Sequence, residues 1–269
     1  MSTLNGMHSQ EELQGYLRVA VRACRAAGRH QMRLFGKTQE VEHKGEIDLV
    51  TAVDRESEEK IVRILRRAFP NHGILAEESP PSRGTGSFLW VVDPLDGTTN
   101  YSRGFPVFCV SIALAQRGRV VAGAVYNPVL NELFTATRGG GARLNGRRLQ
   151  VSAQEDLDGA FLATGFPYDI RRSKWNNLDH FTRFATRCLA IRRAGSAALD
   201  LAGVACGRFD GYWELKLKPW DLAAGTLLVT EAGGRVSSME GRSWTLKQGG
   251  VVASNGRVHR RMLDVLNSH

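Results

Sequence analysis

Two carboxylates, Asp93 and Asp96, stand three residues apart in the segment 90–100, WVVDPLDGTTN. Apolar residues precede them, so we expect a buried strand that ends in a turn and aims both side chains at one point. Pro94 removes a backbone donor and stiffens the turn, while Gly97 permits a backbone conformation that residues with a Cβ avoid. The segment therefore predicts two acids held close together.

Two carboxylates this close together need a neutralising positive charge. Two adjacent carboxylates repel each other and raise the pKa of one of them unless cations neutralise the charge. Oxygen donors without a nearby His or Cys favour Mg2+. If Thr98 and Thr99 begin a helical turn, their amides form a seat for phosphate. Taken alone, the segment is as consistent with a surface turn as with a metal site.

Three further acidic segments stand at the ends of expected elements. Glu77 and Glu78 follow a short apolar run, Asp48 and Asp54 stand at a boundary between a loop and a helix, and Asp221 opens an apolar helix. Each one alone is typical of a helix cap or a surface pair. Together with the first pair, they are better explained by one shared metal site.

The composition is typical of globular proteins. Of the 269 residues, 42% are hydrophobic and 23% are charged, which excludes a disordered or collagen-like chain. The excess of 36 Lys and Arg over 27 Asp and Glu gives a formal charge of +9, which raises the local concentration of anionic ligands. Nucleic acid, anionic lipid and phosphorylated metabolites are all compatible partners.

Cysteine spacing and the N-terminal residues limit the remaining classes. The four cysteines show no metal-ligand spacing, which argues against a zinc site and against a disulfide framework. The first residues lack the basic and apolar regions of a signal peptide, and no stretch approaches the ~18 apolar residues of a membrane span. We therefore expect a cytoplasmic protein without membrane attachment.

Hydrophobic periodicity predicts two long helices in the N-terminal half, at about 11–35 and 54–69. Thr51 and Asp54 fit a capping box at the start of the second helix. Strand-like runs separated by turn residues follow and should form an antiparallel sheet. These runs are 88–92, 107–115, 120–125 and 132–137.

The C-terminal half is expected to alternate strands with helices, which favours an α/β arrangement. The expected strands are 160–164, 189–191 and 211–215, and the expected helices are 175–187, 197–206 and 221–232. No linker divides the chain. We therefore expect a single unit, 1–269, whose halves 1–145 and 146–269 pack together with a cleft between them.

These motifs resemble those of the inositol monophosphatase family. The resemblance covers the chain from about residue 10 to the C-terminus. At Ala76 the family usually has Gly, and a small residue still fits there. The matching motifs, in the expected order, are DLVT at 48–51, EES at 77–79, WVVDPLDGTTN at 90–100, GSAA at 195–198, WDLAAG at 220–225 and TEAGG at 230–234.

The resemblance implies a fold and an activity. The fold would be a layered αβαβα sandwich of the sugar-phosphatase type, in the α/β (α+β) class, and usually a homodimer. The activity would be hydrolysis of a phosphate monoester on a small polyol or sugar, with inositol 1-phosphate as the expected substrate. Two or three Mg2+ ions per active site and inhibition by Li+ are also implied. The implied metal ligands are Glu77, Asp93, Asp96, Asp221 and the carbonyl of Leu95.

Catalytic and substrate-binding roles follow from the same resemblance. Thr98, together with Asp54 and Glu77, would position and deprotonate the attacking water. The amides of Gly97 and Thr98 would bind phosphate, and Glu214 would accept hydrogen bonds from polyol hydroxyls. The remaining residues of the substrate pocket would be Gly195, Ser196 and Ala197.

The sequence leaves other substrates open. Relatives of this fold act on fructose 1,6-bisphosphate, histidinol phosphate or nucleotide bisphosphates. Lys216 and Lys218 stand near Glu214, where like charge would disfavour the cationic amine of histidinol phosphate and a second phosphate would be tolerated. Fructose 1,6-bisphosphatase activity therefore stays open as a second activity.

A binding role of another class rests on five arginines that face one side of the first helix. A solvated helix face is one interpretation of this stripe, and docking onto RNA or a transcription complex is the other. No RNP motif, KH loop or aromatic platform in the sequence supports specific RNA recognition. The five arginines are Arg18, Arg22, Arg25, Arg29 and Arg33.

Overall fold

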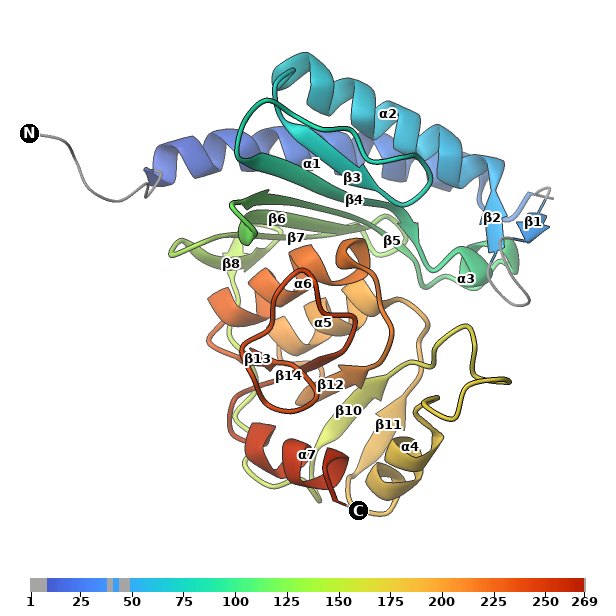
Figure 1. The fold of residues 1–269 in the computed structure, drawn as a ribbon, viewed down its shortest axis with the longest axis vertical. Helices are drawn as coiled ribbons and strands as arrows, with labels where there is room; N and C mark the ends of the chain where they lie inside the picture. The colour runs from blue at the N-terminus through green and yellow to red at the C-terminus, as the bar shows by residue number, and fades with distance from the viewer. Residues whose placement is uncertain (1–8, 38–40, 44–48, 269) are drawn as a thin grey trace, which may run out of the picture.

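The chain folds into five stacked layers, which alternate between helices and sheets (Figure 1). A computed structural model describes residues 9–37, 41–43 and 49–268. Asp48 lies outside these residues. The order of the layers is αβαβα, as expected from the sequence, so the predicted fold class is confirmed.

The outermost layer consists of helices α1 (Gln10–Leu34) and α2 (Ala52–Ala68). A capping box starts α1, in which the Ser9 hydroxyl accepts from the Glu12 amide at 3.2 Å and the Glu12 carboxylate accepts from the Ser9 amide at 2.9 Å. The apolar stripe of each helix is buried against the first sheet, as its 3.6-residue periodicity requires. Both helices were predicted within a few residues.

The first sheet has seven strands in the order β3-β4-β5-β6-β7-β8-β9. Its neighbouring strands are antiparallel except for β3 and β4, which are parallel. The prediction of an antiparallel sheet is therefore correct for the strands that were recognised from the sequence. It missed β3, which pairs in parallel with β4 at one edge of the sheet. The strands are β3 (Gly73–Ala76), β4 (Phe88–Asp96), β5 (Cys109–Gln116), β6 (Arg119–Asn127), β7 (Glu132–Thr137), β8 (Gly141–Leu144) and β9 (Arg147–Arg148).

Two short elements complete the N-terminal part. Strands β1 (Val41–His43) and β2 (Leu49–Thr51) pair in an antiparallel ladder beside the start of α2. Helix α3 (Thr98–Ser102) follows β4 directly. Gly97, at the junction, has φ of +101°, and a Cβ there would lie 2.8 Å from the Val107 carbonyl oxygen. Only glycine fits this junction without strain.

The second sheet is mixed, with five strands in the order β11-β10-β12-β14-β13. Strands β11, β10 and β12 are mutually parallel, while β14 is antiparallel to both of its neighbours. The two C-terminal strands were not anticipated from the sequence. The strands are β10 (Phe161–Thr164), β11 (Ala190–Arg192), β12 (Gly211–Glu214), β13 (Arg235–Ser237) and β14 (Val251–Ser254).

Helices α5 (Ala197–Ala205) and α6 (Pro219–Glu231) form the central layer between the two sheets. A helix covered on both sides must be apolar around its circumference, and most residues of α5 and α6 are buried. Small residues allow the close packing: a Cβ on Gly123 of β6 would lie 3.1 Å from the Ala224 Cα of α6. This layer ties both halves of the chain to one core.

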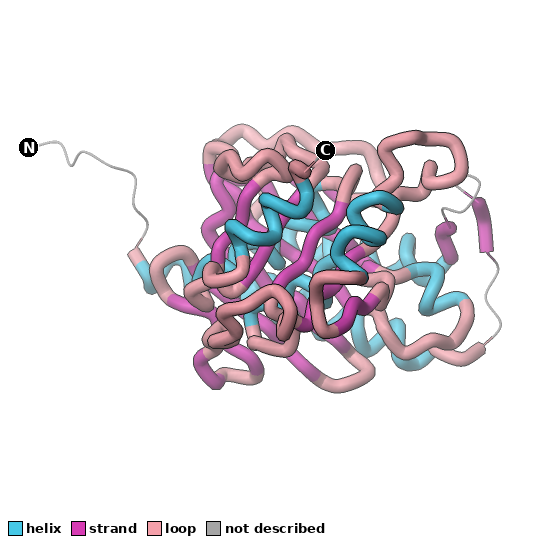
Figure 2. The backbone as a smooth tube through the Cα atoms, turned by 90° about the horizontal axis from the view of Figure 1, so that it is seen from below, coloured by secondary structure: helices cyan, strands magenta, loops and turns pink. Residues whose placement is uncertain are grey.

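The last layer consists of α4 (Leu178–Ala185) and α7 (His259–Leu266). Seen from below in Figure 2, they lie side by side on the outer face of the second sheet. No helix among the described residues is long and apolar enough to cross a membrane. The four cysteines are free.

Candidate active site

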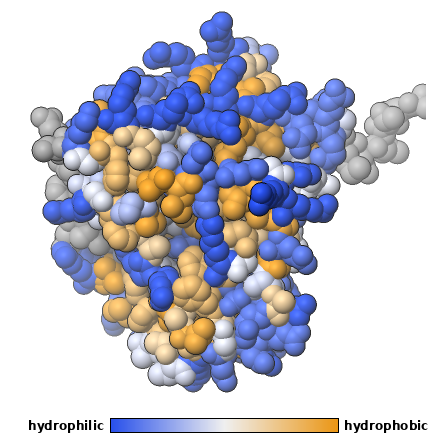
Figure 3. Space-filling view, turned by 180° about the vertical axis from the view of Figure 1, so that it is seen from behind, coloured by the Kyte–Doolittle hydropathy of each residue, from blue (hydrophilic) through white to orange (hydrophobic). Residues whose placement is uncertain are grey.

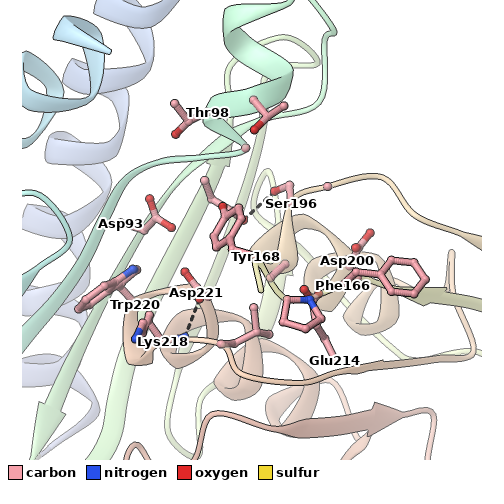
Figure 4. A pocket seen from close by; sticks show the side chains of 18 of the residues that line it. Asp93, Thr98, Phe166, Tyr168, Ser196, Asp200, Glu214, Lys218, Trp220 and Asp221 are labelled. Carbon is pink, nitrogen blue, oxygen red and sulfur yellow. Dashed lines mark hydrogen bonds between the residues drawn. The ribbon is translucent and has the colours of Figure 1, made fainter. Parts of the chain in front are cut away.

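A pocket of about 240 Å³ lies where the two halves of the chain meet. The carboxyl end of β4, the amino ends of α5 and α6 and the loop after β10 surround it (Figure 4). Most of the residues singled out from the sequence line this pocket. They are Glu77, Asp93, Leu95, Asp96, Gly97, Thr98, Gly195, Ser196, Ala197, Glu214 and Asp221.

The turn after β4 orients its two carboxylates by breaking the strand register. The pairing of β4 with β5 shifts between Asp93 and Asp96. Asp93 is 2% exposed, and its Oδ1 accepts from the Leu95 amide at 3.0 Å. Helix α1 anchors the turn, because Gln31 Nε2 donates to the Pro94 carbonyl at 2.7 Å. The turn is therefore fixed from both sides.

Asp96 points at the amino end of α5. Its Oδ2 accepts from the Ser196 hydroxyl at 2.7 Å and from the Ala198 amide at 2.8 Å. The Cys109 thiol lies 3.8 Å from the same oxygen. Amides at a helix start favour negative charge, so α5 stabilises the charged form of Asp96.

The other two predicted metal ligands come from different elements. Asp221 lies in the first turn of α6, where its Oδ2 accepts from the Lys218 amide at 2.7 Å. Glu77 follows β3 directly and is half-buried. The acids thus reach one pocket from β3, β4 and α6, although α6 lies more than a hundred residues after the two strands in the sequence.

The electrostatic environment of the pocket disfavours the ionised form of its carboxylates. Burial raises the pKa of Asp93 well above its usual range, and the charges of Glu77, Asp96 and Asp221 raise it further. Burial likewise raises the pKa of Asp221, followed by the charge of Asp96. Burial also raises the pKa of Asp96, although the Ser196 hydroxyl opposes the shift. Such a set calls for a positive ligand.

These donors fit a hard divalent cation. In the described part of the chain, no three His, Cys, Asp or Glu side chains are already assembled as a complete metal-binding group. Mutual repulsion keeps free carboxylates apart, so we expect them to converge when a cation binds. The hydrogen bonds described for Asp93 and Asp221 engage one oxygen of each carboxylate, which leaves the second oxygen for the cation. Oxygen donors of this kind suit Mg2+.

Thr98 and Asp54 form a hydrogen-bonded pair at the edge of the pocket. The Thr98 hydroxyl lies 2.7 Å from Asp54 Oδ1 and 3.1 Å from the Leu95 carbonyl oxygen. Asp54 is fully buried behind Thr98 and does not line the pocket itself. Its other oxygen accepts from the Thr51 amide at 2.8 Å, as the predicted capping box requires.

Glu214 occupies the opposite end of the pocket, at the end of β12. Its Oε2 accepts from the Tyr212 hydroxyl at 2.6 Å. A Cβ on Gly165 would lie 2.1 Å from the same oxygen, so the backbone packs closely against the carboxylate. Burial raises the pKa of Glu214 to about 7, although the Tyr212 hydrogen bond opposes the shift.

Several lining residues were not recognised from the sequence. Arg193 precedes the GSAA motif, Asp200 follows it, and Phe166, Pro167 and Tyr168 form the loop after β10. The signal for Asp200 was present, because it follows Ser196 by four residues and thus shares a helix face with it. The loop after β10 carried no comparable pattern.

Lys216 lines the pocket, but its ammonium group is directed toward the loop after β10. Nζ donates to Asp169 Oδ2 and to Ser173 Oγ, at 2.6 Å each. The backbone of Lys216 has φ of +60°, a left-handed conformation that is costly for a residue with a Cβ. The sequence argument that Lys216 would tolerate a second phosphate is therefore weakened, because this cation is already paired.

Comparisons with known proteins agree along the chain. A sequence model of the inositol monophosphatase family matches residues 12–269. An inositol-1-monophosphatase of Synechocystis sp. is 45% identical over 260 residues, which are 96% of this chain and 91% of that protein. The Nus factor SuhB of Escherichia coli strain K12 is 48% identical over 250 residues, which are 92% of this chain and 94% of that protein.

A solved structure supports the same relationship. The crystal structure of extragenic suppressor protein suhB from Bartonella henselae matches with a TM-score of 0.89 at 41% sequence identity. The match covers 94% of this chain and 99% of that one. The similarity therefore extends over nearly the whole of both chains.

Proposed function

Because the chain belongs to the inositol monophosphatase family, we propose that it is a Mg2+-dependent phosphatase that hydrolyses inositol 1-phosphate or a similar polyol monophosphate. One observation carries the proposal. A single pocket holds a group of mutually repelling carboxylates at one end and a buried carboxylate acceptor, Glu214, at the other. The first end suits a cation and a phosphate, and the second suits hydroxyl groups.

Thr98 and Asp54 have the arrangement needed to orient a water molecule. A hydroxyl has one proton, and a carboxylate is the stronger of the two acceptors within reach, so Thr98 donates to Asp54. The lone pairs of Thr98 can then accept a hydrogen bond from the attacking water, and as the proton of the water passes to Thr98 the hydroxyl proton would pass to Asp54. Glu77, on the same pocket wall, would help Thr98 to remove that proton.

The remaining residues bind and orient the substrate. The amides of Gly97 and Thr98 would hold the phosphoryl oxygens beside the turn after β4. Two or three Mg2+ ions bound by Glu77, Asp93, Asp96, Asp221 and the Leu95 carbonyl would lower the pKa of the attacking water and neutralise the phosphoryl oxygens. Gly195, Ser196 and Ala197 would form the wall between the phosphate and Glu214.

We also propose three properties from the family and the sequence: inhibition by Li+, a homodimeric state and a cytoplasmic location. Exposed apolar side chains, Phe105 and Leu189 among them, offer contact area for a second copy. Sedimentation equilibrium at micromolar concentration tests the dimer, and a monomeric mass would remove it. A Li+ titration of activity tests the inhibition.

The function is tested by a phosphate-release screen of the purified protein with Mg2+. The substrates are inositol 1-phosphate, histidinol phosphate, fructose 1,6-bisphosphate and adenosine 3',5'-bisphosphate. Turnover should be highest on inositol 1-phosphate, should stop in EDTA and should return when excess Mg2+ is added. Full activity of a chelator-treated, metal-free sample would refute the proposed mechanism.

A second function, docking onto a polyanion, is favoured by the basic face of the outer helices. All five arginines of the α1 stripe are exposed, and Arg22 lines a shallow hollow with Arg63 and Arg67 of α2. Figure 3 shows a hydrophilic surface over this layer, at the top of the molecule. Relatives named Nus factor SuhB support a role beside catalysis.

Filter binding of RNA over a salt series tests this second function. Binding to phosphates through arginines should weaken steeply as salt rises, because neutralised phosphates release counterions. Replacing Arg22, Arg63 and Arg67 by Gln should weaken binding and leave phosphatase activity unchanged. An RNA affinity that does not change with salt, or that is the same in the triple variant and the wild type, would exclude the basic face as the RNA-binding surface.

A further inference from the structure

One buried carboxylate in the pocket has no part in the proposed reaction. Asp200 lies in the first turn of α5, is 2% exposed and lines the pocket. In the part of the chain that the structure describes, no hydrogen bond reaches its carboxylate. A buried carboxylate without a hydrogen-bond donor is unfavourable, so its place at a pocket wall indicates that a ligand supplies the donor.

The position of Asp200 on α5 separates it from the cation end. Ser196 holds Asp96 at the start of the helix, and Asp200 lies one turn further along the same face. In Figure 4, Asp200 and Glu214 lie on one side of the pocket, and Asp93 and Trp220 lie on the other. Asp200 therefore belongs with Glu214 at the end of the pocket remote from the cation.

Glu214 is already held in place at this end. Its Oε2 accepts from Tyr212, and the Gly165 backbone packs against the carboxylate. Its Oε1 remains available to accept from a ligand. With Asp200, the wall presents two fixed carboxyl groups, which in their ionised form accept hydrogen bonds from a ligand.

Charge at this end selects the kind of ligand. Burial, followed by the charge of Glu214, raises the pKa of Asp200 well above its usual range, and Arg193 opposes the shift. Two acids beside one arginine leave this end without the excess positive charge that a second phosphate would need. Neutral hydroxyl groups, which donate a hydrogen bond without adding negative charge, match the two carboxylates.

We propose that Asp200 and Glu214 together bind two hydroxyl groups of a neutral polyol, and that Asp200 is a specificity-determining residue. The inference rests on the proposed function, because the phosphate end orients the substrate. It narrows the substrate class to monophosphates that carry at least two free hydroxyls, and it disfavours bisphosphates.

Asp200→Asn tests the inference with two substrates on one preparation. The variant should lower kcat/KM for inositol 1-phosphate by about tenfold or more, mostly through KM, because a charged acceptor is lost. Activity on 4-nitrophenyl phosphate, which has no hydroxyls to bind, should stay within about twofold. The matched control is Asp179→Asn, the same change in the first turn of α4 at an exposed position. This control should leave the activity on both substrates unchanged.

Calorimetry supplies a readout that does not depend on turnover. Binding of myo-inositol, in the presence of Mg2+ and inorganic phosphate, should weaken in Asp200→Asn by a factor similar to the change in KM. Equal losses on both substrates would overturn the inference by placing Asp200 in the cation site, and unchanged values in both assays would overturn it as well. A wild-type protein that cleaves neither phosphate refutes the proposed function, while the calorimetry still decides the role of Asp200.

Discussion

Carboxylates gather at both ends of the pocket, but their surroundings differ. At the cation end, the charges of neighbouring acids raise the pKa of Asp93 and the pKa of Asp221. At the remote end, Glu214 receives a hydroxyl hydrogen bond from Tyr212, and Arg193 offsets part of its charge together with that of Asp200. The same functional group is therefore prepared for a cation at one end and for hydroxyl groups at the other.

This contrast shows that residue type alone does not define the ligand. Repulsion among several acids is relieved by positive charge or by protonation, whereas a buried acid already held by a neutral donor is completed by further neutral donors. Variants at the two ends should consequently fail in different ways. Removing a cation ligand should affect every substrate, while removing a hydroxyl acceptor should affect only substrates that carry hydroxyls.

The largest effect is expected for Asp93→Asn. A neutral amide would bind a cation more weakly than a carboxylate does, so turnover should fall at least about a hundredfold on polyol and aryl phosphates alike. Folding should be preserved, because removing one charge relieves the repulsion described for Asp93. Turnover and thermal melting are measured on the same sample. Activity within tenfold of the wild type would remove Asp93 from the proposed set of cation ligands.

A smaller and selective effect is expected for Glu214→Gln. Loss of a charge-assisted hydrogen bond should reduce kcat/KM for inositol 1-phosphate by roughly 10 to 100-fold. A small aryl phosphate should lose much less, because the catalytic groups remain in place. Glu59→Gln, an exposed change on α2, is the control. Proportional losses on the two substrates would mean that Glu214 acts through the cation end or the fold.

The pH dependence of stability should distinguish the ends further. The folded pKa of Glu214, about 7, exceeds its ordinary value of 4.5, so the folded protein retains a proton that the unfolded chain releases between these values. Stability should therefore fall as pH rises from about 4.5 to about 7, by on the order of 3 kcal/mol.

Urea unfolding at pH 5 and pH 8, with saturating Mg2+ to neutralise the cation end, measures this dependence. Glu214→Gln should flatten the profile relative to the wild type. Parallel profiles for the two proteins would show that Glu214 does not carry the shifted proton equilibrium.

The smallest effect is expected for Lys216→Gly. The variant loses the contacts with Asp169 and Ser173, which hold the loop that carries Tyr168. Glycine relieves the left-handed backbone by roughly 1 kcal/mol, which offsets the loss of an exposed ion pair of about the same size or less. We expect KM to rise a few-fold with kcat and the melting temperature nearly unchanged.

Lys216→Ala separates these two contributions. It loses the ion pair but keeps a Cβ in the left-handed conformation, so it should be less stable than Lys216→Gly and share its KM. A change in kcat in either variant would show that the loop influences the chemical step.

Local patterns in the sequence were sufficient for much of the fold. The capping box of Thr51 and Asp54 and the apolar stripes of the first two helices predicted those helices closely. The turn after β4 was anticipated because proline and glycine leave the backbone few choices there. Strands such as β13 and β14 were missed because their short runs gain stability from tertiary pairing, which no local pattern reports.

The candidate site was harder to predict from the sequence, for a related reason. The acids at the ends of apolar segments stood out individually, but their convergence depends on the packing of β3, β4 and α6. Asp200 resembled an ordinary acid in the first turn of a helix, and only its burial distinguishes it. The pairing of Lys216 with Asp169 joins residues 47 positions apart, a contact that periodicity does not encode.

The origin of the cation ligands has a consequence for the integrity of the whole molecule. Asp93 and Asp96 belong to the first sheet, whereas Asp221 belongs to a helix from the second half of the chain. A cation bound by all three would link the two halves of the chain across the junction. At a concentration a hundred times its dissociation constant, it would add about 2.7 kcal/mol to the free energy of unfolding. If these residues bind a cation as proposed, the supply of divalent ions should set how readily proteases cleave this protein, independently of whether any substrate is present.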